Sequence, residues 1–546
     1  MNPALTKIDG AKISDRIGEV ALLLALCVQC ASAQENLITF VNNPQYGATP
    51  LQTEVGTALQ RVSTTLRLSG GFDLSDPQQV ELYGRCNELV GTSQIIQGVP
   101  PLQGRGFQGE TPAELLLMVQ QVSGSQVTSQ GKLAKHVAAG QFTNISGRLN
   151  ALRLGASHAG SLGKTAAAFD MFQTDRISGL AAGKFATPLR VYSADAWSPS
   201  VGAAQDRNGM STRSHRIDMM LADDGASPSS VARREATSTD ARESGSLQPS
   251  NPWGIFTEGS YNWGDRDPGV NDDGFSFHAT SVTVGGDYNF GSAVAGASIG
   301  YDSFEADFSL ANGGDTHVES LSGSLFGAWA SQRTNLNANA IVSYGSLETE
   351  ITRNILYGPA PCPFQTCGTN RTLVGKPDGR YFAGGVALGY DVSIGSWELS
   401  PSLGVNHRDL KIDRFTESDS GAYGAMALRY EEQDIPSTRS ILSLGIARPI
   451  SAASGVFTPT LRLEWHHEFE GDTAGVAASY AAAPIPCSGC TFTLPRDPQT
   501  DDFGVIGLGV PYVLANRLQG YFYYQAMVGV SQLTSHSFAV GLRKQF

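Results

Sequence analysis

The chain has 546 residues, and nowhere does it approach the roughly 20 consecutive apolar residues that a membrane-spanning helix needs. Its formal net charge of −13 argues against nucleic acid as a partner, because phosphate binding relies on clustered Lys and Arg. Glycine is abundant at 62 residues, charged residues make up only 16%, and the length predicts more than one structural unit.

Residues 1–33 have the pattern of a secretory signal peptide. Three basic residues precede the short apolar run 21–28, and Ala31 and Ala33 form an A-x-A cleavage site. The alternative is an ordinary buried helix. The signal interpretation predicts export across the inner membrane and a mature chain that begins after residue 33.

Residues 34–190 are predicted to form a small helical, passenger-like domain. Apolar side chains recur on one helical face over residues 51–66. Asp76 and Thr111 each precede a proline and resemble N-caps of two further helices, the first of which buries Cys86. A longer amphipathic run is expected to complete the helical bundle, with these apolar positions: Leu133, Val137, Ile145, Leu149 and Leu152.

Residues 191–250 are predicted to be a flexible, low-complexity linker. Small and polar residues dominate it, so it cannot bury enough apolar area to offset the entropy lost on ordering. A polar helix over residues 230–242 would be unstable alone but could lie in a water-filled pore.

From residue 251 to residue 546 apolar and polar residues alternate with a period of two, which predicts β-strands. About 12 strands fit in this region, and an even number of antiparallel strands can close into a barrel. A soluble sandwich would show the same alternation. Export of the chain favours a mainly β fold with a 12-stranded antiparallel transmembrane β-barrel, as do aromatic residues near the predicted strand ends. These aromatic residues are Trp253, Tyr261, Trp263, Tyr381, Tyr390, Trp397, Trp465 and Tyr512.

Two stretches of this region resemble the autotransporter family of type V secretion. They are WGIFTEGSY, which begins at Trp253, and the final SFAVGLRKQF. In the latter, Phe538, Val540, Leu542 and Phe546 resemble the assembly signal of outer-membrane barrels, although Lys544 departs from the family's preference for an apolar residue. The resemblance implies a 12-stranded translocator whose pore holds a helix that leads to an N-terminal passenger.

The implied function is that of an outer-membrane translocator that exports or displays its own N-terminal region at the cell surface. Outer-membrane lipid, the barrel assembly machinery and periplasmic chaperones would be its partners, and the barrel would be monomeric, without cofactor or enzymatic activity. The alternative is a surface adhesin or secreted hydrolase with its activity in residues 34–190. Some family members cut the pore helix at paired asparagines. None occurs between residues 190 and 250, so we predict that the passenger stays attached.

Five cysteines follow the signal segment. In an oxidising compartment the close pairs Cys362/Cys367 and Cys487/Cys490 predict two loop disulfides, which leaves Cys86 free. A zinc site built from the same four thiols, or redox chemistry at the second pair, is the weaker alternative.

Three further motifs are predicted to be structural. Residues 104–109 match a dinucleotide fingerprint but lack a surrounding βαβ unit. Residues 296–300 match a nucleophile elbow but lie within an alternating strand. The His/Glu run 464–470 places its two histidines on opposite faces of a strand, which disfavours a shared metal. No catalytic, cofactor-binding or metal-binding residue is therefore predicted.

Overall fold

The computed structural model describes most of the chain from residue 36 onward. The described residues are 36–101, 105–129, 140, 144, 145, 149, 252–309, 313–331, 333–358, 368–470, 475–498, 500–514, 518–530 and 532–546. No helix within these ranges is both long enough and apolar enough to span a membrane. The predicted signal segment, the linker and its possible pore helix at 230–242 lie outside the described residues.

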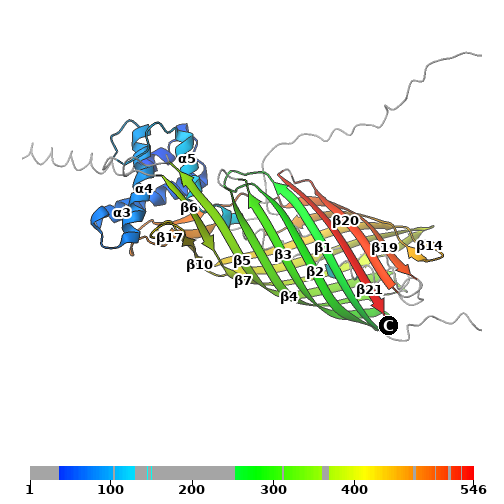
Figure 1. Ribbon diagram of the computed structural model, residues 1–546. Helices are drawn as coiled ribbons and strands as arrows, with labels where there is room; N and C mark the ends of the chain where they lie inside the picture. Colours follow the sequence, from blue (N-terminus) through cyan, green and yellow to red (C-terminus); the bar gives the residue numbers. More distant parts are fainter. Residues whose placement is uncertain are drawn as a thin grey trace, which may run out of the picture. The chain divides into compact units, whose positions relative to one another are not determined.

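The N-terminal part is helical, as predicted. Its elements are α2 (Asn36–Val41), η1 (Pro44–Tyr46), α3 (Pro50–Leu68), η2 (Gly71–Asp73), α4 (Pro77–Ile96) and α5 (Pro112–Gln121). Thr49 and Thr111 each form a complete capping box, and the Asp76 side chain accepts a hydrogen bond from the backbone N–H of Gln78. We call residues 36–129 the cap; its helices α3, α4 and α5 cluster together in Figure 1.

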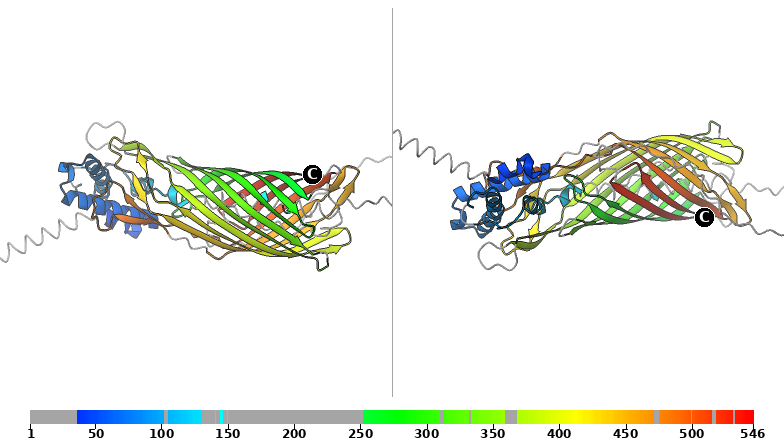
Figure 2. Two further views of the ribbon diagram at one scale, coloured as in Figure 1. Left: turned by 90° about the horizontal axis from the view of Figure 1, so that it is seen from below. Right: turned by 90° about the horizontal axis from the view of Figure 1, so that it is seen from above.

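Twelve long strands form a closed antiparallel barrel, which confirms the predicted fold class. In order around the ring they are β1 (Trp253–Arg266), β2 (Phe275–Asn289), β3 (Ala293–Phe308), β4 (Gly314–Ala330), β5 (Leu336–Tyr357), β7 (Asp378–Tyr390), β9 (Trp397–Ile412), β13 (Gln433–Ala447), β16 (Thr460–Glu468), β19 (Asp502–Leu514), β20 (Leu518–Val528) and β21 (Leu533–Gln545). The last strand pairs with the first, from Gly254–Gln545 to Arg266–Leu533. Figure 2 shows the tilted strands on both sides of the barrel.

Shorter strands extend the two ends of the barrel. The terminus end, where Trp253 and Phe546 lie, carries β8 (Val392–Ile394), β14 (Ile450–Ala452) and β15 (Gly455–Phe457). The opposite end, which we call the cap end, carries β6 (Thr369–Gly375), β11 (Ser418–Asp419) and a separate sheet of β10 (Phe415–Thr416), β12 (Leu428–Tyr430), β17 (Val476–Tyr480) and β18 (Thr491–Leu494).

The period-two pattern sorts the side chains into an apolar outer wall and a largely polar inner wall. Ile255, Leu325 and Leu388 face outward and are more than half exposed, whereas Glu258 on β1 faces inward and is buried. This arrangement is the reverse of a soluble sandwich and fits a barrel whose outer face meets lipid. Tyr381, which we had assigned to the aromatic girdle, faces inward and is 1% exposed, because its position on β7 has inward parity.

The cap and the cap end of the barrel share one hydrophobic core. Helical side chains such as Leu59, Leu82 and Val119 belong to the same buried cluster as Tyr430 of β12 and Phe492 of β18. The cap is therefore not an independent bundle with a closed core of its own.

Candidate functional site: the barrel lumen and the joint to the cap

The inner wall of the barrel is lined by charged and hydroxyl side chains. Several of them neutralise one another: Arg543 Nη2 lies 2.8 Å from Asp287 Oδ1, and Arg439 Nη2 lies 3.0 Å from Glu468 Oε2. Pairing of this kind is what a buried charge requires. Other buried inward-facing side chains are Glu258, Asn262, Ser281, Thr283, Asp302, Asn339, Ser343, Arg408, Ser443 and Arg462.

Four described residues, Gly140, Asn144, Ile145 and Leu149, lie inside this lumen. Asn144 Nδ2 donates hydrogen bonds to Ser281 Oγ at 3.0 Å and to Thr283 Oγ1 at 2.7 Å, both on β2. Ile145 and Leu149 are fully buried in a cluster whose other members are barrel residues. We call these four residues the pore segment.

This position corrects one expectation from the sequence. We had placed Ile145 and Leu149 in the N-terminal helical bundle, but they pack within the barrel. Their apolar spacing is that of any amphipathic helix, and spacing alone does not distinguish a bundle from a pore lined with apolar patches. Asn144, a polar residue next to Ile145, was the indication in the sequence that this helix contacts polar side chains.

A polar joint connects the cap to the loop between β1 and β2. Thr128 Oγ1 donates to Asp272 Oδ1 at 2.8 Å, and Ser125 Oγ donates to Asp273 Oδ2 at 2.7 Å. Both carboxylates are buried, and burial raises the pKa of Asp273 to about 6. Asp272 also lies 3.3 Å from Arg266 Nη2, which supplies positive charge to the joint.

A second set of polar contacts joins α4 to the strands at the cap end. Arg371 of β6 bridges Glu81 of α4, at 2.6 Å, and Asp419 of β11, at 2.7 Å. Arg85 of α4 donates to the backbone carbonyl of Gly368 at 3.1 Å. Arg85 also pairs with the buried Glu88, whose pKa is raised to about 7, mainly because of its burial.

The cysteines at the cap end lie close to the joint. A disulfide joins Cys487 to Cys490 in the turn between β17 and β18, and Cys487 Sγ lies 3.4 Å from Thr65 Oγ1 of α3. Cys86 is a free thiol buried in α4, and burial raises its pKa. Cys362 and Cys367 lie outside the described residues, so their pairing stays a prediction.

The residues predicted to form the assembly signal all lie at the lipid-facing side of β21 or directly after it. Phe538, Val540, Leu542 and Phe546 are 37–52% exposed, and the backbone N–H of Phe546 lies 3.5 Å from the carbonyl oxygen of Trp253. They are therefore accessible from the outer face at the seam of the barrel. Their role as a signal stays a prediction.

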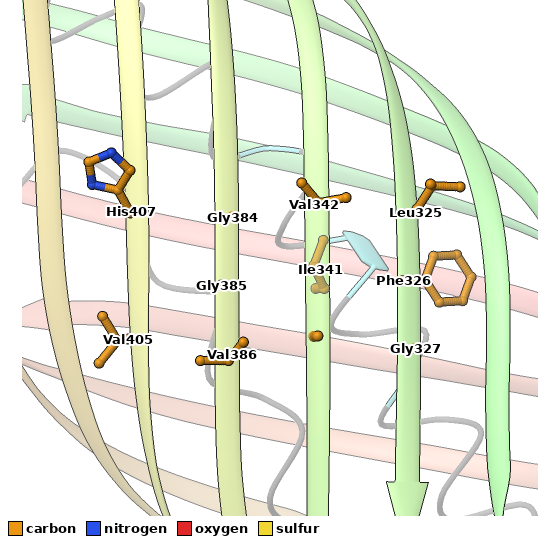
Figure 3. A pocket seen from close by; sticks show the side chains of 11 residues that line it. Leu325, Phe326, Gly327, Ile341, Val342, Gly384, Gly385, Val386, Val405 and His407 are labelled. Carbon is orange, nitrogen blue, oxygen red and sulfur yellow. The ribbon is translucent and has the colours of Figure 1, made fainter.

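A shallow apolar hollow lies on the outer wall across β4, β5, β7 and β9 (Figure 3). The residues that line it include Leu325, Gly327, Val342, Gly384 and Val386. No charged carboxylate or amine lines it. The hollow belongs to the lipid-facing surface, and His407 of β9 is among the side chains that line it.

The remaining motifs lie where the sequence predicted. Ser298 faces inward within β3, which is a strand and not a strand-to-helix turn. On β16, His466 faces inward beside Glu464, at 2.8 Å, while His467 faces outward near Asp502, at 3.0 Å. Within the described ranges, no group of three or more His, Cys, Asp or Glu side chains is placed to hold a metal.

The closed ring, its apolar outer wall and its polar lumen define an outer-membrane β-barrel protein. Residues 255–525 match the family model of the autotransporter beta-domain. The barrel region therefore belongs to this family of translocator barrels, and the family places the barrel in the outer membrane.

Several solved structures are similar to the barrel region, three of them autotransporter domains. The translocator domain of the autotransporter NalP from Neisseria meningitidis is 18% identical, with 54% of this chain and 89% of that chain covered and a TM-score of 0.41. The beta domain of the Bordetella autotransporter BrkA is 15% identical over 54% and 100% of the two chains, with a TM-score of 0.37. The transport unit of AIDA-I from Escherichia coli is 13% identical over 56% and 93%, also with a TM-score of 0.37. No curated protein matches the chain.

Proposed function

We propose that this chain is a surface-display protein whose barrel holds its own helical cap permanently at the cell surface. The observation that carries the proposal is the single hydrophobic core that the cap shares with the strands at the cap end. A passenger that leaves its translocator needs a polar surface where it separates from the barrel. Separation here would instead expose large buried side chains on both partners, among them Leu59, Tyr430 and Phe492.

The cost of separation supports permanent attachment. Each large apolar side chain that returns to water costs about 1.5 to 3 kcal/mol, so exposure of only a few of them outweighs the entropy that release would gain. The joint adds a hydrogen bond that separation would break, because Thr128 of the cap donates to the buried Asp272.

The partners of such a protein follow from its surfaces. The apolar outer wall would contact outer-membrane lipid, and the last strand would be recognised by the barrel assembly machinery after periplasmic chaperones deliver the chain. The barrel would work as a monomer, and display would require neither a cofactor nor catalysis. An adhesive activity would then reside on the exposed face of the cap.

Epitope labelling of intact cells tests the display. An epitope inserted after Gln45, which is exposed in η1, should bind antibody without permeabilisation. The matched control carries the same epitope after Gly395, in the turn between β8 and β9 at the terminus end, and should bind only after permeabilisation. Labelling of the Gln45 epitope only in permeabilised cells would reject surface display.

A further inference from the structure

We propose that the disulfide between Cys487 and Cys490 is a thiol–disulfide exchange site, at which Cys487 is the attacked sulfur and Cys490 the leaving sulfur. Its substrate is a thiol on a peptide or protein. The two cysteines form a C-x-x-C pair in the turn between β17 and β18, and the disulfide between them is formed. The inference goes beyond display, because display makes no use of this sulfur chemistry.

The two sulfurs differ in access. Cys487 is partly buried, and the exposed residues Ser488 and Gly489 follow it. Cys490 is 3% exposed and belongs to the hydrophobic core that the cap shares with the barrel. Thiol–disulfide exchange begins with attack on a sulfur that an external thiol can reach. The difference in burial therefore directs attack to Cys487.

Helix α3 supplies two positioning residues, Arg61 and Thr65, which are four residues apart and so lie on one face of the helix. Thr65 Oγ1 lies 3.4 Å from Cys487 Sγ, and the Thr65 hydroxyl donates to the carbonyl oxygen of Arg61 at 2.9 Å. A thiol freed at Cys487 can donate to the hydroxyl oxygen. Rotation of the same hydroxyl gives a thiolate at Cys487 a hydrogen-bond donor.

The side chain of Arg61 brings positive charge to the turn. A Cβ built at Gly489 would lie 3.6 Å from Cγ of Arg61 and 4.0 Å from its Nε. A guanidinium beside a cysteine favours the thiolate, which is the form that reacts. Arg61 and Thr65 thus favour the same chemistry at the same turn.

The exchange step balances without a further reagent. The lone pair of the external thiolate forms a bond to Cys487 Sγ, while the bond between Cys487 and Cys490 breaks. Cys490 leaves with the bonding electrons and takes a proton from water. The external sulfur is oxidised and the Cys490 sulfur is reduced, and the product is a mixed disulfide between Cys487 and the partner. Attack by Cys490 on that product reverses the step.

The residues that precede the attacked sulfur indicate the class of thiol. Ile485 is 88% exposed, and only Pro486, which is also exposed, separates it from Cys487. A peptide with an apolar side chain beside its own cysteine can cover Ile485 while the two sulfurs meet, and burial of apolar area stabilises that encounter. We therefore assign a peptide or protein thiol with apolar neighbours as the substrate.

Two substitutions test which sulfur reacts. Cys490→Ser and Cys487→Ser each leave one thiol in the same turn of the folded, full-length protein. The protein is treated with dithiodipyridine, a neutral disulfide, and peptide mapping measures the adduct at each cysteine separately. We expect Cys487 in the first variant to react at least tenfold faster than Cys490 in the second. Equal rates, with heat-modifiability showing that both barrels have assembled, would overturn the proposal.

The unaltered protein provides a second measurement. After incubation of the folded, oxidised protein with a peptide thiol, the reaction is quenched with acid and the adducts are mapped. We expect the mixed disulfide on Cys487. An adduct mainly on Cys490 would reverse the assigned roles, and the absence of any adduct on this pair would show that the disulfide is only structural.

Substitutions in α3 test the two positioning residues. In the Cys490→Ser protein, Thr65→Val and Arg61→Gln should each slow the reaction with dithiodipyridine at least threefold, whereas Thr65→Ser and Arg61→Lys should restore most of the rate. Thr64→Val is the matched control and should leave the rate unchanged, because the Thr64 hydroxyl donates to the carbonyl oxygen of Gln60. Rates in the first two variants equal to that of the parent would contradict the positioning roles.

A pair of peptides tests the substrate class. The two peptides differ only in the residue beside their cysteine, which is leucine in one and serine in the other. The unaltered protein should form its mixed disulfide at least threefold faster with the leucine peptide, and Ile485→Ser should abolish this preference. Equal rates for the two peptides would contradict the assigned substrate.

Discussion

At the residue scale, Asp273 makes attachment of the cap sensitive to pH. Burial raises its pKa from 3.8 to about 6 in the docked protein. A carboxyl group whose pKa is raised by docking favours the docked state when it is protonated, so this contribution is complete below about pH 4 and is lost as pH rises through 6. We expect the cap to resist urea better at pH 5 than at pH 7.5, by on the order of 2 kcal/mol at most.

The measurement uses protein whose chain has been cut at a protease site inserted near residue 205. Fractionation then gives the urea concentration at which the cap separates from the barrel. Asp273→Asn keeps a hydrogen-bonding side chain but cannot titrate, so it should remove the part of the pH dependence that comes from Asp273 and leave any part that comes from Glu88, whose pKa burial raises to about 7. A variant with the same pH dependence as the parent protein would show that another group is responsible.

Substitution of Phe546 can distinguish a role in the assembly signal from a role in lipid contact alone. Phe538 and Phe546 are 42% and 52% exposed at the same strand, so either change to serine should cost a similar 1.5 to 3 kcal/mol or less of lipid contact. If position 546 is read during assembly, Phe546→Ser should lower the yield of heat-modifiable barrel in outer membranes severalfold more than Phe538→Ser does. Equal yields from the two variants would remove the special role of the terminal aromatic.

At the scale of elements, the start of α5 should control how well the cap is ordered. Thr111 forms a capping box with Glu114, in which the Thr111 N–H donates to Glu114 Oε2 at 2.7 Å. Thr111→Ala removes the hydroxyl that caps the helix and should destabilise the docked cap by about 1 kcal/mol. Urea release of the cap, measured as above, detects this loss; Thr111→Ser is the control and should be nearly neutral.

The elements also show what the sequence could and could not predict. The strands were predictable because each one alternates residues such as Ile255 and Phe256 between lipid and lumen. The helix starts at Thr111 and Asp76 were predictable because capping is a local interaction. The shared core was not, because it joins residues such as Leu59 and Phe492 that are more than 400 positions apart and carry no mutual pattern.

The candidate site was predictable only in part. A helix in the pore was expected from the family resemblance, and Asn144 and Ile145 lie in the lumen, whereas the polar stretch 230–242 lies outside the described residues and stays a prediction. The partners of Asn144, such as Ser281, could not be predicted, because they are set by strand register and not by the polarity of the helix. The disulfide between Cys487 and Cys490 was easier to predict, because the two residues are close in sequence.

At the scale of the whole molecule, the cap should depend on the barrel for its fold. A fragment of residues 34–160 lacks Tyr430, Phe492 and the other barrel members of the shared core. We therefore expect this fragment to show helical spectra without a cooperative thermal transition, since short helices need tertiary packing. Circular dichroism with temperature decides this, and a sharp melt would show that the cap is autonomous.

The converse experiment concerns the barrel. Residues 251–546 contain every strand of the closed ring, so they should refold in detergent into a heat-modifiable β-rich form. Without the cap, the apolar side chains of β12, β17 and β18 would be exposed to water, and the fragment should bind a hydrophobic dye more strongly than the full chain does. Helix-dominated spectra would contradict the assignment of this region.

The pairing of β1 with β21 has a consequence for the order of events in assembly. The ring closes only when Gly254 pairs with Gln545 across the seam, so a sheet that already holds its eleven other strand contacts still has an open side. While this seam is open, it gives Asn144 and Ile145 a lateral entrance to the lumen that the finished ring does not offer.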